Sequence, residues 1–113
     1  MGNFLNDASV TDLCYFLRND GWTRSVNLRF NRICASGLLG LNAMLDDNEN
    51  LISLDIRDNP GMIASEGDRI RFGEDVRNVS KSIYDKLLRN IKIFKEKREK
   101  MRKMQQEQMM NNL

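Results

Sequence analysis

The sequence contains no histidine and only two cysteines among its 113 residues. Histidine is the side chain used most often for acid–base catalysis and for metal binding, so its absence disfavours both. Cys14 and Cys34 are isolated and form no CxxC pair, and two distant cysteines cannot complete a four-ligand zinc site. A secreted disulfide scaffold would carry more cysteines. We therefore expect a reducing compartment, with both cysteines acting as small buried apolar residues.

Several functional signatures are missing as well. No apolar run reaches the length of a membrane span, and residues 1–7 lack the basic-then-apolar order of a signal peptide. The sequence has no Walker loop, GxGxxG or GxSxG motif. Residues 46–49 resemble part of a calcium loop but lack its central glycine and final glutamate. These absences predict a non-catalytic cytoplasmic protein with no cofactor, no metal and no small-molecule substrate.

The charge is unevenly distributed along the chain. Residues 92–113 carry seven Lys/Arg against three Glu, whereas residues 1–91 carry eleven Lys/Arg against thirteen Asp/Glu. The overall charge of +2 therefore combines a mildly acidic body with a basic tail. Such a division predicts two parts with different roles.

A pattern of apolar and asparagine positions recurs at an offset of 28 residues. The offset places Val26, Leu28 and Asn31 on Leu54, Ile56 and Asn59. In the other direction it places Asn31, Ile33, Leu41 and Leu45 on Asn3, Leu5, Leu13 and Leu17. An internal repeat of this length predicts stacked units that bury each other's apolar faces.

Each unit has the pattern of a short strand, a turn and a helix. Val26–Leu28 alternates apolar and polar residues as a half-buried strand does, and Leu41 and Leu45 share one helical face. We expect Asp7 or Ser9 to cap the first helix and Ser36 to cap the second. The asparagines at positions 31 and 59 are interpreted as structural, satisfying backbone groups at the turns.

The string from Ile33 to Asn59, I-x3-G-x3-L-x3-L-x5-L-x2-L-x-I-x2-N, resembles the repeat of ribonuclease-inhibitor-type leucine-rich-repeat proteins. The resemblance covers roughly residues 3–62. The shorter string LDIRDNP, at residues 54–60, is similar to the last repeat of a centrosomal and basal-body leucine-rich-repeat protein. The first resemblance implies a curved solenoid, and the second implies a ciliary or centrosomal, cytoskeletal location.

The predicted fold is α/β: a short leucine-rich-repeat solenoid of parallel strands with outer helices, followed by a long C-terminal helix. The solenoid and its cap would occupy residues 1–73, with Met62, Ile63, Ile70 and Phe72 covering the open end of the core. Apolar residues spaced three or four apart predict a helix from Glu74 onward: Val76, Val79, Ile83, Leu87, Ile91 and Phe94. Residues 74–113 would then form one helix with a basic tail rich in methionine and glutamine.

A solenoid would present the residues that flank its strands on a concave face. The predicted partner-binding residues are Arg24, Asn27, Arg29, Phe30, Ser53, Asp55, Arg57 and Asp58. The 28-residue offset places Arg29 beside Arg57. Two adjacent arginines repel each other unless an anion lies between them. The alternative is that the two side chains splay into solvent or are neutralised by Asp58.

The basic tail contains a second set of candidate binding residues: Lys95, Lys97, Arg98, Lys100, Arg102 and Lys103. It could be a solvated extension, a coiled-coil contact or a dock for an acidic surface such as tubulin. Nucleic acid is disfavoured because no aromatic residue follows Phe94 among the basic residues. Membrane insertion is disfavoured because the apolar side chains of the tail are mainly methionines.

Together these patterns predict a non-catalytic scaffold that binds protein partners within a larger ciliary or centriolar assembly. Two alternatives remain open. One is an adaptor fragment, such as a ligase substrate receptor or an immune-type sensor, and the other is a tail-led binder of nucleic acid or an anionic surface.

Overall fold

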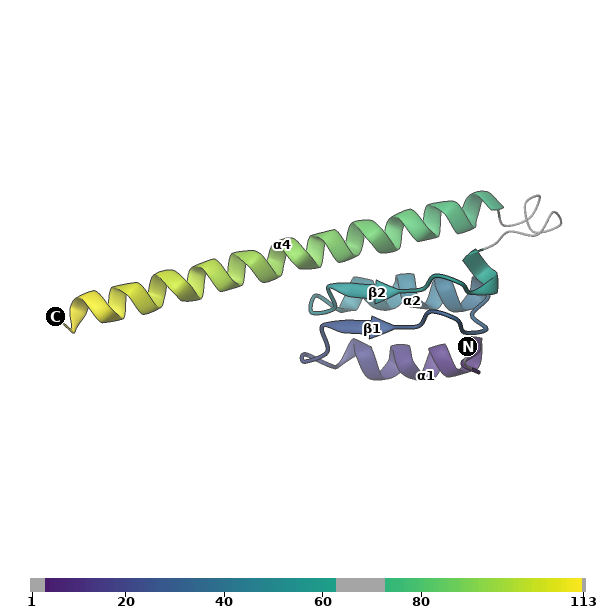
Figure 1. Ribbon diagram of the computed structural model, residues 1–113, viewed down its shortest axis with the longest axis horizontal. Helices are drawn as coiled ribbons and strands as arrows, with labels where there is room; N and C mark the ends of the chain where they lie inside the picture. The colour runs from purple at the N-terminus through teal and green to yellow at the C-terminus, as the bar shows by residue number, and fades with distance from the viewer. Residues whose placement is uncertain (1–3, 63–72, 113) are drawn as a thin grey trace.

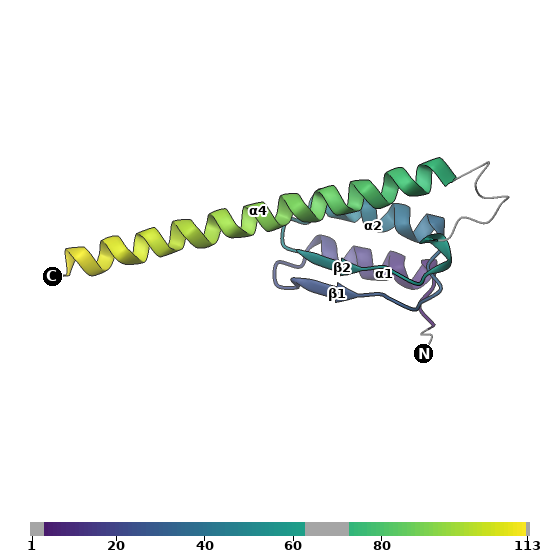
Figure 2. The same ribbon diagram turned by 45° about the horizontal axis from the view of Figure 1, so that its top comes forward.

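The computed structural model describes residues 4–62 and 73–112. Two strand-containing units lie side by side, and one long helix runs along the second of them and extends well past it (Figure 1). The elements, in chain order, are α1 (Asp7–Arg18), β1 (Ser25–Asn27), α2 (Ala35–Asp47), β2 (Ser53–Asp55), the 3₁₀ turn η1 (Pro60–Met62) and α4 (Gly73–Asn111). The molecule measures 68 × 25 × 24 Å, and the part of α4 beyond the units gives it this elongated shape (Figures 1 and 2).

The predicted α/β leucine-rich-repeat solenoid is wrong. In the described ranges the helices α1, α2 and α4 contain 12, 13 and 39 residues, whereas β1 and β2 contain three residues each. Strands of three residues form only a minimal sheet. After Pro60 the described chain forms a 3₁₀ turn and then α4, so it does not continue as a series of stacked units. The described part of the fold is predominantly helical, with one two-stranded parallel sheet.

The two strands nevertheless pair at the offset that the sequence suggested. Ser25 lies opposite Ser53, Val26 opposite Leu54 and Asn27 opposite Asp55. Because the strands are parallel, the chain must cross over between them, and α2 provides this connection.

Two buried asparagines join neighbouring segments. The Asn31 side chain accepts the Leu5 backbone N–H (3.2 Å) and donates to the Leu28 carbonyl (2.9 Å). Asn59 accepts the Ile33 N–H (3.1 Å) and donates to the Leu28 carbonyl (2.8 Å). Each amide therefore satisfies backbone groups that the turns leave unpaired, and the structural interpretation of both asparagines is confirmed.

The helix caps differ from those predicted. Asn6 caps α1 and forms a reciprocal capping box with Ser9, so neither proposed residue is the N-cap. Helix α2 follows Cys34 and has no side-chain cap of its own. Asp7 of α1 supplies one instead, because its carboxylate accepts the Cys34 N–H (2.8 Å) and the Ser36 hydroxyl. Ser36 therefore donates to Asp7 rather than capping the helix itself.

A single core runs through both units and into α4. Its buried apolar members are Val10, Cys14, Leu17, Leu28, Ile33, Leu38, Leu41, Met44, Leu45, Leu51, Ile56, Ile83 and Leu87. Among the described residues, this core contains aliphatic and sulfur-bearing side chains and no aromatic one. Every large aromatic group in the described part of the chain must therefore lie outside it.

Helix α4 is fixed to the body by apolar and polar contacts. Val79, Ile83 and Leu87 pack into the core, which confirms this part of the predicted stripe. Asn90 is fully buried and donates to the Asn48 carbonyl (2.9 Å) and the Leu51 carbonyl (2.8 Å). The side chain of residue 76 and the proposed cap residues 63, 70 and 72 lie outside the described part.

Candidate protein-binding surfaces

The eight predicted partner-binding residues are here called the strand surface. Seven of them lie along β1 and β2 or in the turns that follow these strands, and the eighth, Arg24, directly precedes β1. Asn27 and Ser53 are exposed strand residues, whereas Asp55 is half-buried. Arg57 and Asp58 are exposed after β2. The structure therefore brings the residues around the two strands together, with Asn27 directly opposite Asp55. Residue 24 is an exception, because its side chain turns toward α4.

Two of the three arginines of the strand surface, Arg29 and Arg57, are neutralised within the protein. The Arg29 Nε lies 2.5 Å from the Asp58 carboxylate. Arg57 donates to both carboxylate oxygens of Asp55, at 2.9 and 2.8 Å. These hydrogen bonds lower the pKa of Asp55 to about 2 and raise the pKa of Arg57. Asp58 neutralises Arg29, as the alternative stated, whereas Arg57 is neutralised by Asp55. Neither of these two arginines therefore requires a bound anion.

The turns after the two strands share one backbone conformation. Phe30 and Asp58 have φ values of 59° and 58°, in the left-handed region. Aspartate tolerates this region, whereas a bulky residue is disfavoured there. The Phe30 N–H donates to the Arg57 carbonyl at 3.2 Å, and the Arg29 guanidinium lies 4.6 Å from the ring centroid. This hydrogen bond and the contact with the Arg29 guanidinium hold a half-exposed aromatic ring in place.

The basic tail is helical along its described length. The six predicted binding residues of the tail, which lie on α4 between Lys95 and Lys103, are all exposed. Arg102 makes an ion pair with Glu99 at 3.0 Å. No helix among the described residues is both long and apolar enough to cross a membrane.

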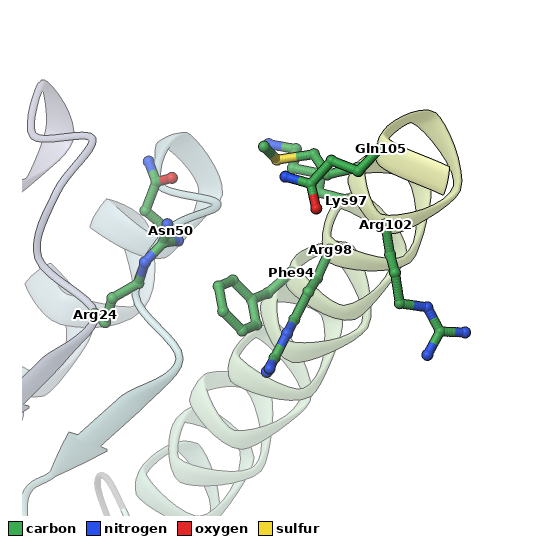
Figure 3. Close-up of a pocket in the computed structure, with 8 residues that line it drawn as sticks. Arg24, Asn50, Phe94, Lys97, Arg98, Arg102 and Gln105 are labelled. Carbon is green, nitrogen blue, oxygen red and sulfur yellow. The ribbon is translucent and has the colours of Figure 1, made fainter. Parts of the chain in front are cut away.

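A cleft forms where α4 leaves the body. It has a volume of about 550 Å³ and is lined by Arg24, Asn50, Phe94, Lys97, Arg98, Met101, Arg102 and Gln105. We call it the basic cleft, because four of these residues are cationic and none is acidic. Phe94 and Gln105 lie on the side of α4 that faces Arg24 and Asn50, whereas the Arg102 side chain points away from them (Figure 3). The Arg24 guanidinium is 4.8 Å from the Phe94 ring centroid.

The sequence patterns missed a group of exposed aromatic residues at the C-terminal end of α1. Tyr15 is 78% exposed, Phe16 is 62% exposed and Trp22 is 89% exposed. We call these three residues the aromatic surface. Their exposure could have been inferred from the sequence, because all three fall outside the repeating apolar positions that build the core.

Hydrogen bonds to the Asp20 side chain hold the turn that carries Trp22. The Asp20 carboxylate accepts the backbone N–H groups of Trp22 (3.0 Å) and Thr23 (3.1 Å). Hydrogen bonding by Thr23 and Trp22 lowers the pKa of Asp20. Tyr15 and Phe16 line a shallow depression that also includes Asp20. The same aspartate therefore borders the two helix aromatics and fixes the backbone of the tryptophan.

The cysteines occupy different environments. Cys14 is buried, as predicted, and burial raises the pKa of its thiol. Cys34 is exposed at the start of α2, so its predicted burial is wrong. Within the described ranges no cluster of three or more cysteine or carboxylate side chains could hold a metal ion. In the segment that resembles a calcium loop, Asp46 and Asp47 are the last residues of α2, Asn48 is the C-cap of this helix, and residue 49 lies in the connection to β2.

Comparison with known proteins gives no relative from which a function could be transferred. No family model, no curated protein and no solved structure matches the chain.

Proposed function

We propose that this protein is a non-catalytic protein-binding module that works within a larger assembly and contacts its partner through the aromatic surface. The observation that carries the proposal is the separation of aromatic residues from the core. Two of them, Tyr15 and Phe16, line one depression on α1, and Trp22 follows in the turn just after this helix; each of the three is more than 60% exposed. Tyrosine and tryptophan are enriched among the residues that dominate protein–protein binding.

The arrangement of the elements supports this location. α4 packs along α2 on one side of the body, whereas α1 lies on the opposite side (Figures 1 and 2). The aromatic surface therefore belongs to the side that α4 leaves open. Large apolar groups exposed together favour a partner contact over a purely solvated surface.

A ciliary or centriolar setting, with the cytoskeleton as the wider location, stays a prediction from the sequence resemblance. The alternative roles as an adaptor or an immune-type sensor would use the same kind of contact. A named partner is needed to separate these settings, and the aromatic surface gives a way to find it.

The test is affinity capture from a cell lysate, quantified by mass spectrometry, with the wild-type chain and two triple variants. One variant carries Tyr15→Ser, Phe16→Ser and Trp22→Ser. We expect its specific partner to be reduced at least about tenfold, because truncating a single dominant interface residue costs about 2 kcal/mol or more. Circular dichroism checks that each variant is folded.

The matched control changes three exposed apolar residues elsewhere: Leu39→Ser, Tyr84→Ser and Leu88→Ser. These side chains are 52%, 61% and 45% exposed. A partner lost from the aromatic-surface variant and kept by the control supports the proposal. A partner kept by both variants, or lost equally from both, contradicts it.

A further inference from the structure

We propose that the basic cleft is a second binding site and that it takes an acidic amphipathic helix of a partner protein. The site is separate from the aromatic surface, so it can bind whether or not that surface does. Three features carry the inference: uncompensated positive charge, an apolar seam that continues past the body, and an opening bounded by two different parts of the fold.

The charge of the cleft is of one sign. Its cations come from the segment before β1, which contributes Arg24, and from α4, which contributes Lys97, Arg98 and Arg102. In the described part of the chain only Arg102 of these four makes an ion pair, with Glu99. A concave site with three unpaired cations concentrates positive potential and attracts a negatively charged ligand.

The apolar seam follows from the spacing along α4. On the body, Ile83 and Leu87 fill the core, and Phe94 comes next on the same side of the helix. Continuing at steps of three and four residues reaches Met101 and Met104, which are 62% and 55% exposed. The face that docks α4 on the body thus extends beyond it, and no described residue of the chain covers that extension.

An acidic amphipathic helix would match both the positive charge and the apolar seam of the basic cleft. Its apolar side chains would lie on Met101 and beside Phe94, and methionine adapts readily to the shape of a partner. Its carboxylates would pair with Lys97 and Arg98, which flank the seam. Recognition of an amphipathic helix by an apolar groove with complementary charges is a common mode of peptide binding.

A second copy of the chain is a poor occupant. Residues 92–113 carry seven Lys/Arg against three Glu, so two tails placed side by side would repel each other. An acidic partner converts the same charges into attraction.

Nucleic acid and membrane surfaces fit less well. Single-stranded nucleic acid needs accessible aromatic faces on which bases stack, but Phe94 is half-buried and Arg24 lies over its ring. A bilayer presents a broad flat surface, whereas these cations line a cleft between the body and α4.

The experiment is a fluorescence-anisotropy titration of the full chain with a labelled, stapled helical peptide of about 15 residues. A helix of that length spans about 22 Å; leucines occupy one face and glutamates the other. We expect saturable binding at physiological ionic strength. Lys97→Glu with Arg98→Glu should weaken it about tenfold or more, because attraction becomes repulsion at two positions.

The matched control is Arg77→Glu with Lys81→Glu, which makes the same change in net charge at two exposed positions of α4 near the other end of the helix. We expect less than a twofold effect from it. Equal weakening by both double variants would show a general charge effect and overturn the proposal, as would the absence of binding.

Three further probes identify the source of any binding. A poly-glutamate peptide of equal charge should bind more weakly than the amphipathic helix, because it lacks the apolar contact. Oligothymidylate or phosphatidylserine vesicles that bind as tightly as the peptide, with the same sensitivity at Lys97 and Arg98, would overturn the assignment to a protein helix. The aromatic-surface variant should bind the peptide normally, so failure at one site is distinguishable from failure at the other.

Discussion

Replacing Asn90 by alanine should destabilise the protein more than any exposed substitution on the same helix. The Asn90 side chain is fully buried and donates to the carbonyls of Asn48 and Leu51. Arg89 also donates to the Asn48 carbonyl, at 3.2 Å, so that acceptor keeps a partner. The Leu51 carbonyl would lose the amide that satisfies it. A buried unsatisfied acceptor costs about 1–3 kcal/mol, and the other lost hydrogen bond adds about 1 kcal/mol.

We therefore expect Asn90→Ala to lower the free energy of unfolding by about 2–4 kcal/mol. With a denaturant slope of about 2 kcal/mol per molar urea, the midpoint falls by about 1–2 M. Far-UV circular dichroism during a urea titration measures this midpoint.

The control for this experiment is Asn78→Ala, on the same helix but exposed. Alanine is the better helix former, so this change should be neutral or slightly stabilising. Equal midpoints for Asn78→Ala and Asn90→Ala would refute the inference that Asn90 docks α4 on the body.

Two further predictions test other contacts. A Cβ at Gly37 would lie 2.5 Å from the Asp7 carboxylate, so Gly37→Ala should lower the melting temperature. A Cβ at Gly40 meets nothing within 4 Å. Because alanine is the better helix former, Gly40→Ala should raise the free energy of unfolding by about 0.5–1 kcal/mol. The pKa of Asp55 is lowered to about 2 by Arg57, so the stability it contributes is present above its unfolded-state pKa of about 3.9 and is lost as the pH falls toward 2. An NMR titration of the Asp55 carboxyl carbon checks this value, and Arg57→Ala should return the pKa toward its ordinary range; an unchanged pKa in that variant would contradict the assigned cause.

The sequence predicted the contacts that depend on regular spacing. The 28-residue offset placed Asn27 opposite Asp55, which is the observed register. The stripe from Val79 to Leu87 predicted the docked face of α4. Asn31 and Asn59 were interpreted from their positions after apolar strands, and their hydrogen bonds agree with that interpretation.

Features that depend on distant parts of the chain were not predicted. The solenoid was wrong because a strand pattern shows where extended chain begins but not that each strand will contain only three residues. The pairing of Arg57 with Asp55 needed side-chain geometry that spacing alone does not give.

The candidate sites were also only partly predictable. The basic tail is visible in the sequence as a charge imbalance, but the cleft needs Arg24 and Phe94 to meet across the fold. Asn90 left a readable signal, because it is a polar residue at a stripe position between Leu87 and Phe94. Polar residues at such positions indicate either solvent or buried backbone partners, and only the fold selects between them.

The cap that α1 supplies to α2 has a consequence for the order of folding. The carboxylate of Asp7 accepts the N–H of Cys34, the residue just before α2, which lies 27 positions further along the chain. Contacts of α4 with the α2–β2 connection, such as Asn90 with Asn48, close loops of 42 residues. Because longer loops are slower and entropically costlier to close, the two units should nucleate together, and α4 should dock afterward onto a surface that is already formed. During synthesis the body would emerge before α4, and the carbonyls of Leu45 and Leu51 would lack their partners on α4 until this helix docks.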